Sequence, residues 1–129
     1  MYREVISTTR NIIYSYYRQH ARSFPWRETR DPYCVLVSEI MLQQTQTGRV
    51  MEKYEAFLSR FPDFAALAKT DLNSVLQAWQ GLGYNRRAVS LKETAVRVIE
   101  EHDGILPKDL NELMKLPGIG PSTAGAILA

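Results

Sequence analysis

This sequence of 129 residues contains a single cysteine, Cys34, and no long apolar run. One cysteine cannot form an internal disulfide, and one thiol cannot hold a structural zinc ion or an iron–sulfur cluster. No apolar stretch approaches the roughly 20 residues that span a bilayer, and the N-terminal residues lack the continuous apolar region of a signal peptide. We therefore expect a cytoplasmic protein in which Cys34 is a small core residue.

An excess of charge of one sign is also nearly absent, because the chain has 16 basic and 14 acidic residues and a net charge of +2. Residues 1–30 are the basic part, with six arginines against two glutamates. This balance permits a nucleic-acid partner without requiring one. The hydrophobic content of 45% is sufficient for one core in a single domain over residues 1–129.

Helical periodicity dominates the sequence, and we find no alternating strand pattern. Apolar spacings of three and four residues predict a first helix before the loop at residues 23–33 and three later helices. These three run from about Pro32 to Gln43, over residues 50–61, and from Arg86 to about His102. The prediction is an all-α, multi-helix bundle.

Capping signals predict four further helices and the end of the long one. Asp63, Asp71 and Asp109 each stand at an N-cap position. Gly104 stands where the long helix should close. Pro121 begins the last helix, with Ser122 or Thr123 near its cap. The sequence ends inside that helix, so we expect an incomplete domain.

A carboxylate, Glu39, lies within the apolar helix that ends in "SEIMLQQTQT" (residues 38–47). Three apolar residues share its helix face, which should be buried: Val35, Leu36 and Leu42. Apolar surroundings raise the pKa of a carboxyl group, which suits a general acid. The alternative is a buried glutamate paired with Arg27 or Arg49. On the residues alone, "QQTQT" is also compatible with a polar loop.

A helical hairpin is predicted at about residues 109–129, centred on "LPGIG". Gly118 and Gly120 permit a positive φ and close approach of another backbone. The following helix offers free N–H groups at its positive end, which can bind a phosphate without a cluster of lysines. The alternative is an ordinary glycine-bearing corner between two helices.

Three strings, which together span residues 24–129, resemble the helix-hairpin-helix base-excision DNA glycosylases and most closely the A/G-specific adenine DNA glycosylases. They are "FPWRETRDPYCVLVSEIMLQQTQ", "WQGLGYNRRA" and "LPGIGPSTAGAILA". The resemblance implies an all-α protein that binds double-stranded DNA and excises adenine mispaired with guanine or 8-oxoguanine. It also implies a four-cysteine 4Fe-4S cluster in a later segment that this chain lacks.

The resemblance assigns roles to residues that match the family's motifs. Glu39 matches the catalytic glutamate that protonates the adenine ring. Gln44 and Thr45 match residues that enter the base stack. Ser122 stands where the related endonuclease III enzymes carry a lysine that forms a Schiff base; serine cannot do so, which indicates base removal without strand cleavage. As a bare residue, Ser122 is also a candidate helix cap.

The expected DNA contacts fall in three segments. They are Gln43, Gln44 and Thr45; then Tyr84, Asn85 and Arg86; and finally Leu116, Gly118, Ile119, Gly120, Ser122 and Thr123. Arg87 is a further candidate phosphate ligand, with a solvated surface arginine as the alternative.

Two departures from the family pattern bear on specificity and activity. Adenine glycosylases commonly have a second tyrosine where this chain has Asn85. The family's catalytic aspartate, which stabilises the sugar cation, lies beyond residue 129. We therefore expect these residues alone to be inactive, and to be monomeric unless the apolar end at Ile127 and Leu128 drives self-association. The alternatives are a mismatch glycosylase with another target base and a non-catalytic helix-hairpin-helix module that binds DNA.

Overall fold

The computed structural model describes residues 31–43 and 47–129, and within them it contains seven helices and no strand. In chain order the helices are α2 (Pro32–Leu42), α3 (Thr47–Arg60), α4 (Phe64–Lys69), α5 (Leu72–Ala78), α6 (Arg86–Glu101), α7 (Leu110–Met114) and α8 (Pro121–Leu128). The all-α prediction is confirmed for this part of the chain. The helix predicted near the N-terminus, together with Arg27, Gln44 and Thr45, lies outside the described residues.

Aspartate side chains start three of the short helices, as predicted. Asp63 accepts a hydrogen bond from the backbone N–H of Ala66 at 2.8 Å, and Asp71 accepts one from that of Ser74 at 2.9 Å. Asp109 accepts in the same way, three residues before its donor, at 3.0 Å. Each carboxylate satisfies an N–H group that has no partner within the helix, which fixes where the helix begins.

Helix α8 begins at Pro121, as predicted, but its cap differs from the prediction. Gly120 is the N-cap, it makes no side-chain capping bond, and Pro121 occupies the first helical turn. Ser122 and Thr123 therefore lie inside the helix, and their assignment as caps is wrong. The physical reason is Pro121, whose fixed φ suits the first helical position and which pushes the preceding residue out of helical conformation.

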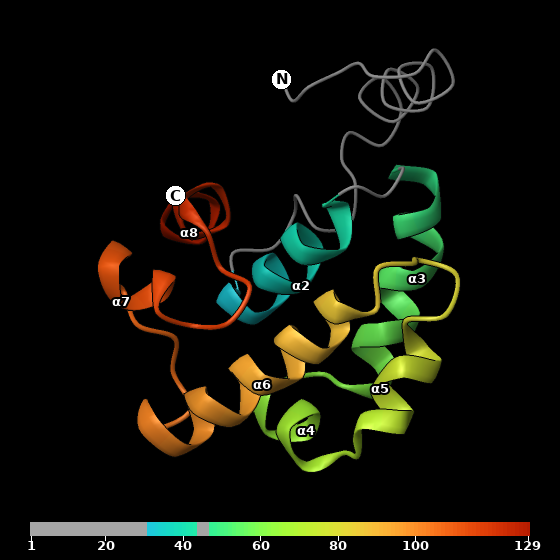
Figure 1. Cartoon of the computed structure of the whole chain (residues 1–129), viewed down its shortest axis with the longest axis horizontal. Coiled ribbons are helices and arrows are strands. Elements are labelled where there is room, and N and C mark those ends of the chain that lie inside the picture. Colours follow the sequence, from blue (N-terminus) through green and yellow to red (C-terminus); the bar gives the residue numbers. More distant parts are fainter. Residues whose placement is uncertain (1–30, 44–46) are drawn as a thin grey trace.

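Helices α2 and α6 lie at the centre of the described bundle (Figure 1). Helix α4 packs on α6, whereas α3 and α8 both pack on α2. Leu36, Val37 and Met41 of α2 are fully buried, and Trp79 is fully buried after α5, as expected for a core tryptophan. Cys34 is half-buried at the edge of this core and its thiol lies 3.8 Å from a carboxylate oxygen of Asp31.

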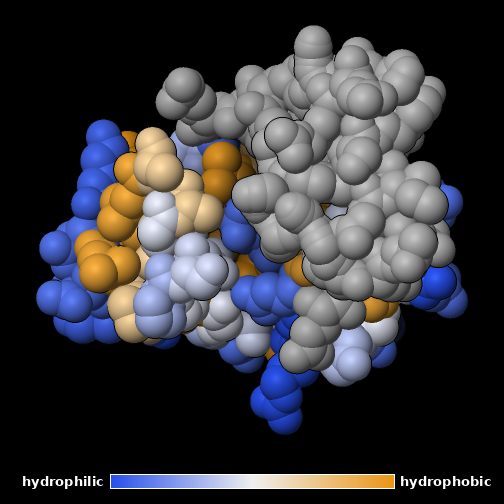
Figure 2. All heavy atoms as spheres, turned by 90° about the horizontal axis from the view of Figure 1, so that it is seen from above, coloured by the Kyte–Doolittle hydropathy of each residue, from blue (hydrophilic) through white to orange (hydrophobic). Residues whose placement is uncertain are grey.

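Apolar surface gathers at the end of the molecule formed by α7 and α8 (Figure 2). Leu128 is 42% exposed there, whereas Ile127 is half-buried against the core. Self-association through this end stays a prediction. Among the described residues, no helix is long and apolar enough to cross a membrane.

Candidate functional site

Glu39 is half-buried near the middle of α2. Of its apolar neighbours, Leu36 is fully buried, while Val35 and Leu42 are half-buried. The face is therefore only partly buried, and Glu39 itself keeps some exposure at the edge of the core. Arg49, considered above as its partner, donates a hydrogen bond to the backbone carbonyl of Gly81 at 2.9 Å.

The C-terminal end of α2 is held by Arg87, from the first turn of α6. The guanidinium donates to the carbonyls of Ile40 at 2.6 Å and Met41 at 3.2 Å, and also to that of Gln43. The last carbonyls of a helix have no partner within it and carry partial negative charge, so a buried cation suits this position. Burial lowers the pKa of Arg87, but the guanidinium remains charged at neutral pH.

The same guanidinium also reaches the turn that precedes α6. It donates to the carbonyls of Leu82 at 3.3 Å and Gly83 at 3.4 Å. Arg87 thus binds backbone with its guanidinium, and phosphate contact by this residue stays a prediction. Its neighbour Arg86 is exposed and keeps that role as a prediction.

Tyr84 is the most conspicuous residue of this turn, because its side chain is 62% exposed. Its φ is +50°, in the left-handed region that residues other than glycine rarely adopt. The Arg87 guanidinium lies 5.5 Å from the centroids of both the Tyr84 and the Trp79 ring. An exposed aromatic ring held on strained backbone is a feature of functional surfaces.

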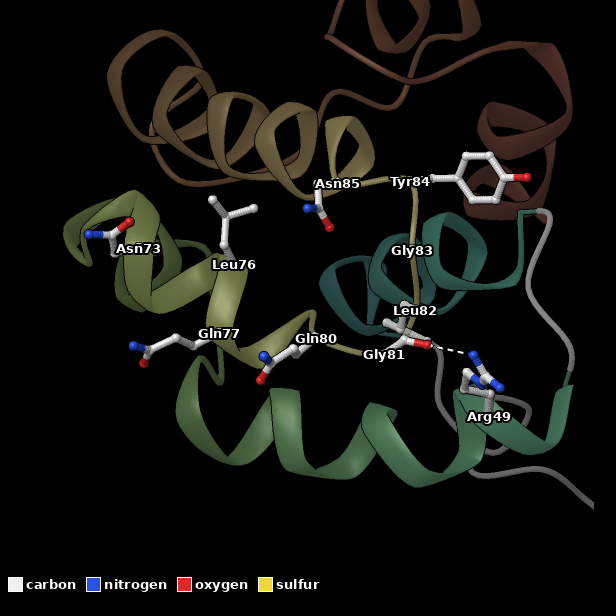
Figure 3. A pocket seen from close by; sticks show the side chains of 10 residues that line it. All are labelled: Arg49, Asn73, Leu76, Gln77, Gln80, Gly81, Leu82, Gly83, Tyr84 and Asn85. Atoms are coloured by element: carbon white, nitrogen blue, oxygen red, sulfur yellow. Dashed lines mark hydrogen bonds between the residues drawn. The ribbon is translucent and has the colours of Figure 1, made fainter.

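A hollow of about 890 Å³ lies beside this turn, between α3 and α5 (Figure 3). Three amides line its α5 side at spacings of four and three residues: Asn73, Gln77 and Gln80. Asn85 lines it from the turn, whereas the Tyr84 ring points away from it. Sequence reasoning missed this amide row, although its helical spacing was a usable signal. Each amide can donate and accept hydrogen bonds, and among the described residues no carboxylate lines the hollow.

A smaller hollow of about 280 Å³ brings the three predicted segments together. Gln43 borders it from the end of α2, Tyr84 and Arg86 from the turn, and Gly118 from the hairpin. These segments are far apart in sequence, and the structure places them around one depression in the surface. Within residues 31–43 and 47–129, two arginines and no acidic side chain line the depression.

The hairpin consists of α7, a tight turn and α8, and α6 holds the turn in place. The Thr94 hydroxyl donates to the carbonyl of Pro117 at 2.8 Å, and Arg97 donates to that of Lys115 at 3.3 Å. Gly118 has a φ of +80° and so uses the conformational freedom of glycine. Gly120 has a φ of −98° and does not. Gly120 adopts extended backbone because it is the residue before Pro121.

The predicted contact residues differ in exposure. Tyr84, Asn85, Arg86, Gly118 and Ser122 are exposed, whereas Gln43 and Gly120 are half-buried. Leu116, Ile119 and Thr123 are at most 5% exposed, so a ligand at the surface would meet their backbone groups and not their side chains. The Thr123 hydroxyl instead accepts a hydrogen bond from the side-chain amide of Gln43 at 3.2 Å.

No metal centre is formed within the part of the chain that the structure describes, where no three His, Cys, Asp or Glu side chains group together. The whole sequence has one cysteine, so its residues do not fit the four-thiolate cluster that the resemblance implies elsewhere.

Comparison with known proteins gives the family. The model of the HhH-GPD superfamily of base excision DNA repair proteins matches residues 37–121, which include Glu39, the Tyr84 turn and most of the hairpin. The chain belongs to this superfamily. Both the all-α fold and the resemblance inferred from sequence are thereby confirmed.

Relatives of this HhH-GPD chain carry consistent names. An adenine DNA glycosylase of Buchnera aphidicola subsp. Baizongia pistaciae is 43% identical over 118 residues, covering 92% of this chain and 34% of the relative. The human adenine DNA glycosylase is 40% identical over 138 residues, covering 98% of this chain and 25% of the relative. The chain thus spans about a third or less of the length of these curated relatives.

Solved structures agree with the fold. A thermostable thymine-DNA glycosylase superposes with a TM-score of 0.78 at 34% identity, over 93% of this chain and 56% of that one. A trapped covalent complex of endonuclease III with DNA superposes with a TM-score of 0.74 at 21% identity, over 95% of this chain and 60% of that one. At that identity, the second similarity supports the fold alone.

Proposed function

We propose that this chain is part of a monofunctional DNA glycosylase that removes adenine mispaired with guanine or 8-oxoguanine from double-stranded DNA. One observation carries the proposal: Glu39 lies partly accessible in α2, close in sequence to a depression bordered by the end of α2, the Tyr84 turn and the hairpin. The names of the relatives at 40% and 43% identity support adenine as the target. Such an enzyme would act on the nucleoid in the cytoplasm.

The chemistry divides among residues of this chain. Glu39 protonates the adenine ring so that the base can leave the sugar. Backbone N–H groups at the start of α8 bind a phosphate and position the duplex. Tyr84, Gln44 and Thr45 enter the base stack and compensate for part of the cost of extracting a base, which is about a few kcal/mol.

Residues 1–129 contain no match to the family's aspartate that stabilises the sugar cation. We therefore expect this chain alone to bind duplex and to excise adenine very slowly, because protonation without charge stabilisation lowers only part of the barrier. Single-turnover assays on the isolated chain, with adenine opposite 8-oxoguanine, measure this rate.

A chimera supplies the decisive test. In it, this chain replaces the 118 matching residues of the Buchnera adenine DNA glycosylase. The chimera should excise adenine opposite 8-oxoguanine, and Glu39→Gln should reduce the rate by orders of magnitude without changing duplex affinity, since the variant keeps size and loses the acid. A chimera that binds duplex and is inert would favour the non-catalytic alternative.

The same chimera distinguishes target bases and reaction type. A panel with thymine opposite guanine tests the alternative target, which Asn85 and the similarity to a thymine-DNA glycosylase make worth measuring. Borohydride should trap no covalent adduct, because Ser122 cannot form an imine. An adduct would contradict the monofunctional assignment.

A further inference from the structure

The three segments around the 280 Å³ depression belong to different elements, and a network of hydrogen bonds joins them. Arg87 holds the end of α2 and the turn at Leu82 and Gly83 through five backbone carbonyls. The third segment is the hairpin, which is joined to the end of α2 by a hydrogen bond between two side chains.

That connection is made by Gln43, the C-cap of α2. Its side-chain amide donates to the hydroxyl of Thr123 at 3.2 Å, across a separation of 80 positions in the chain. Thr123 is 4% exposed and lies in the first turn of α8, where backbone N–H groups are free for a ligand. The backbone carbonyl of Gln43 is in turn bound by Arg87. One residue therefore joins α2, α6 and α8.

We infer that Gln43 is a positioning residue, which fixes the phosphate-binding start of α8 relative to the end of α2 through its bond to Thr123. This inference rests on the proposed function, and it replaces the direct DNA contact that we expected of Gln43 from the sequence.

A positioning role predicts a particular pattern of affinities. Binding to an undamaged duplex depends on phosphate contacts, whereas preference for a duplex with a missing base depends on the relative placement of hairpin and inserted residues. Gln43→Met keeps the length of the side chain and removes the amide. It should reduce the preference for an abasic-site analogue over undamaged duplex by roughly fivefold, as expected for one hydrogen bond. Affinity for undamaged duplex should not change, and the melting temperature should fall by no more than about 5 °C, because one part-buried hydrogen bond is lost.

Thr123 variants provide the matched test. Thr123→Val, which keeps the shape and removes the acceptor, should reproduce the effect, and Thr123→Ser should preserve the wild-type preference. In the Gln43→Met background, Thr123→Val should have no further effect, because the two groups act as one pair. Glu100→Met introduces the same side chain on an exposed face of α6, away from both hollows, and should leave the preference unchanged.

The experiment measures fluorescence anisotropy of this 129-residue chain at fixed salt, with a tetrahydrofuran abasic analogue as the lesion. Equal losses on both duplexes, or additive effects of the two substitutions, would overturn the inference. If the wild-type chain shows no preference for the lesion, the proposed function fails at this step, and amide hydrogen exchange in the absence of DNA decides the inference. Gln43→Met should then speed exchange at residues 120–124 and not in α4; unchanged exchange at residues 120–124 would overturn the positioning role.

Discussion

At the scale of single residues, Gly118 occupies the tightest point of the hairpin. Its φ of +80° is a conformation that side chains with a Cβ rarely adopt, and a Cβ placed there would lie 3.1 Å from the Cβ of Ser90. Backbone strain and crowding therefore act at one position, and both follow from the close packing of the turn against α6. The glycine at position 118 permits a positive φ, but the sequence does not indicate that Ser90 is the neighbour.

Gly118→Ala should destabilise the protein by about 1 kcal/mol, because an L-residue in the left-handed region is strained. For a domain of this size, the melting temperature should fall by roughly 3–5 °C. Affinity for all duplexes should fall alike, since the turn presents backbone donors and reads no base. Thermal unfolding followed by circular dichroism and anisotropy at fixed salt measure the two effects.

Two controls separate backbone strain at Gly118 from crowding against Ser90. Gly125→Ala in α8 has open space around its Cβ and no positive φ, and it should not destabilise the protein. Repeating Gly118→Ala in a Ser90→Gly background removes the 3.1 Å contact and leaves the strain. An unchanged melting temperature for Gly118→Ala would contradict the strained turn.

At the scale of elements, α5 illustrates how a short helix depends on its cap. Asp71 is fully exposed, and hydrogen bonds from the hydroxyl and backbone amide of Ser74 lower its pKa. A pKa that is lower in the folded than in the unfolded protein means that the ionised form contributes stability. This contribution is present above the unfolded pKa and is lost as the pH falls through the folded pKa.

Asp71→Asn should therefore show a stability difference from the wild type that depends on pH. The wild type should be the more stable at about pH 6, and the difference should shrink below about pH 4, where Asp71 becomes protonated. Asparagine keeps the capping oxygen, so it isolates the effect of charge, whereas Asp71→Ala should destabilise α5 at both pH values. A difference that is constant from pH 6 to acid would refute the assignment. Thermal unfolding at a series of pH values provides the measurement.

Local signals explain which elements could be predicted. Asp63, Asp71 and Asp109 bind N–H groups three residues away, so the pattern is contained in a few letters of sequence. Ser122 satisfied the same statistical preference and was assigned wrongly, because Pro121 decides where α8 begins. The bonds of Arg87 to Ile40 and of Gln43 to Thr123 join positions 47 and 80 apart, and no local pattern encodes such distances.

At the scale of the whole molecule, the resemblance anticipated which segments would meet, and the packing of α2 between α3 and α8 explains why they do. The sequence could not show which of the predicted contact residues are exposed and which are buried. Thr123 and Leu116 are buried while Ser122 is exposed, and this depends on how α8 turns its face toward α2. Exposure depends on tertiary packing, because sequence periodicity identifies the apolar face of a helix but not the element that packs against it.

Two buried tyrosines connect the helices of the core, and they make the whole domain sensitive to alkaline pH. Tyr33 of α2 is 2% exposed and donates a 2.5 Å hydrogen bond to the carbonyl of Phe61, just after α3; Tyr54 of α3 is 3% exposed. Burial is the larger cause, and the nearby Cys34 the second, of a pKa that is raised well above the usual range for both hydroxyls. A raised folded pKa means that stability is fully present below the unfolded pKa of about 10 and is lost as the pH rises above it.

The free energy of unfolding should therefore be flat from about pH 8 to about pH 9.5 and should decline above about pH 10, where the unfolded chain ionises its tyrosines and the folded chain cannot. Tyr33→Phe removes one of these groups, so its decline should be shallower. At neutral pH the same variant should be less stable by about 1 kcal/mol, because the carbonyl of Phe61 loses its donor. The variant and wild-type curves should thus converge as the pH rises. Urea titrations at each pH measure this, and parallel curves would show that Tyr33 does not carry the alkaline sensitivity.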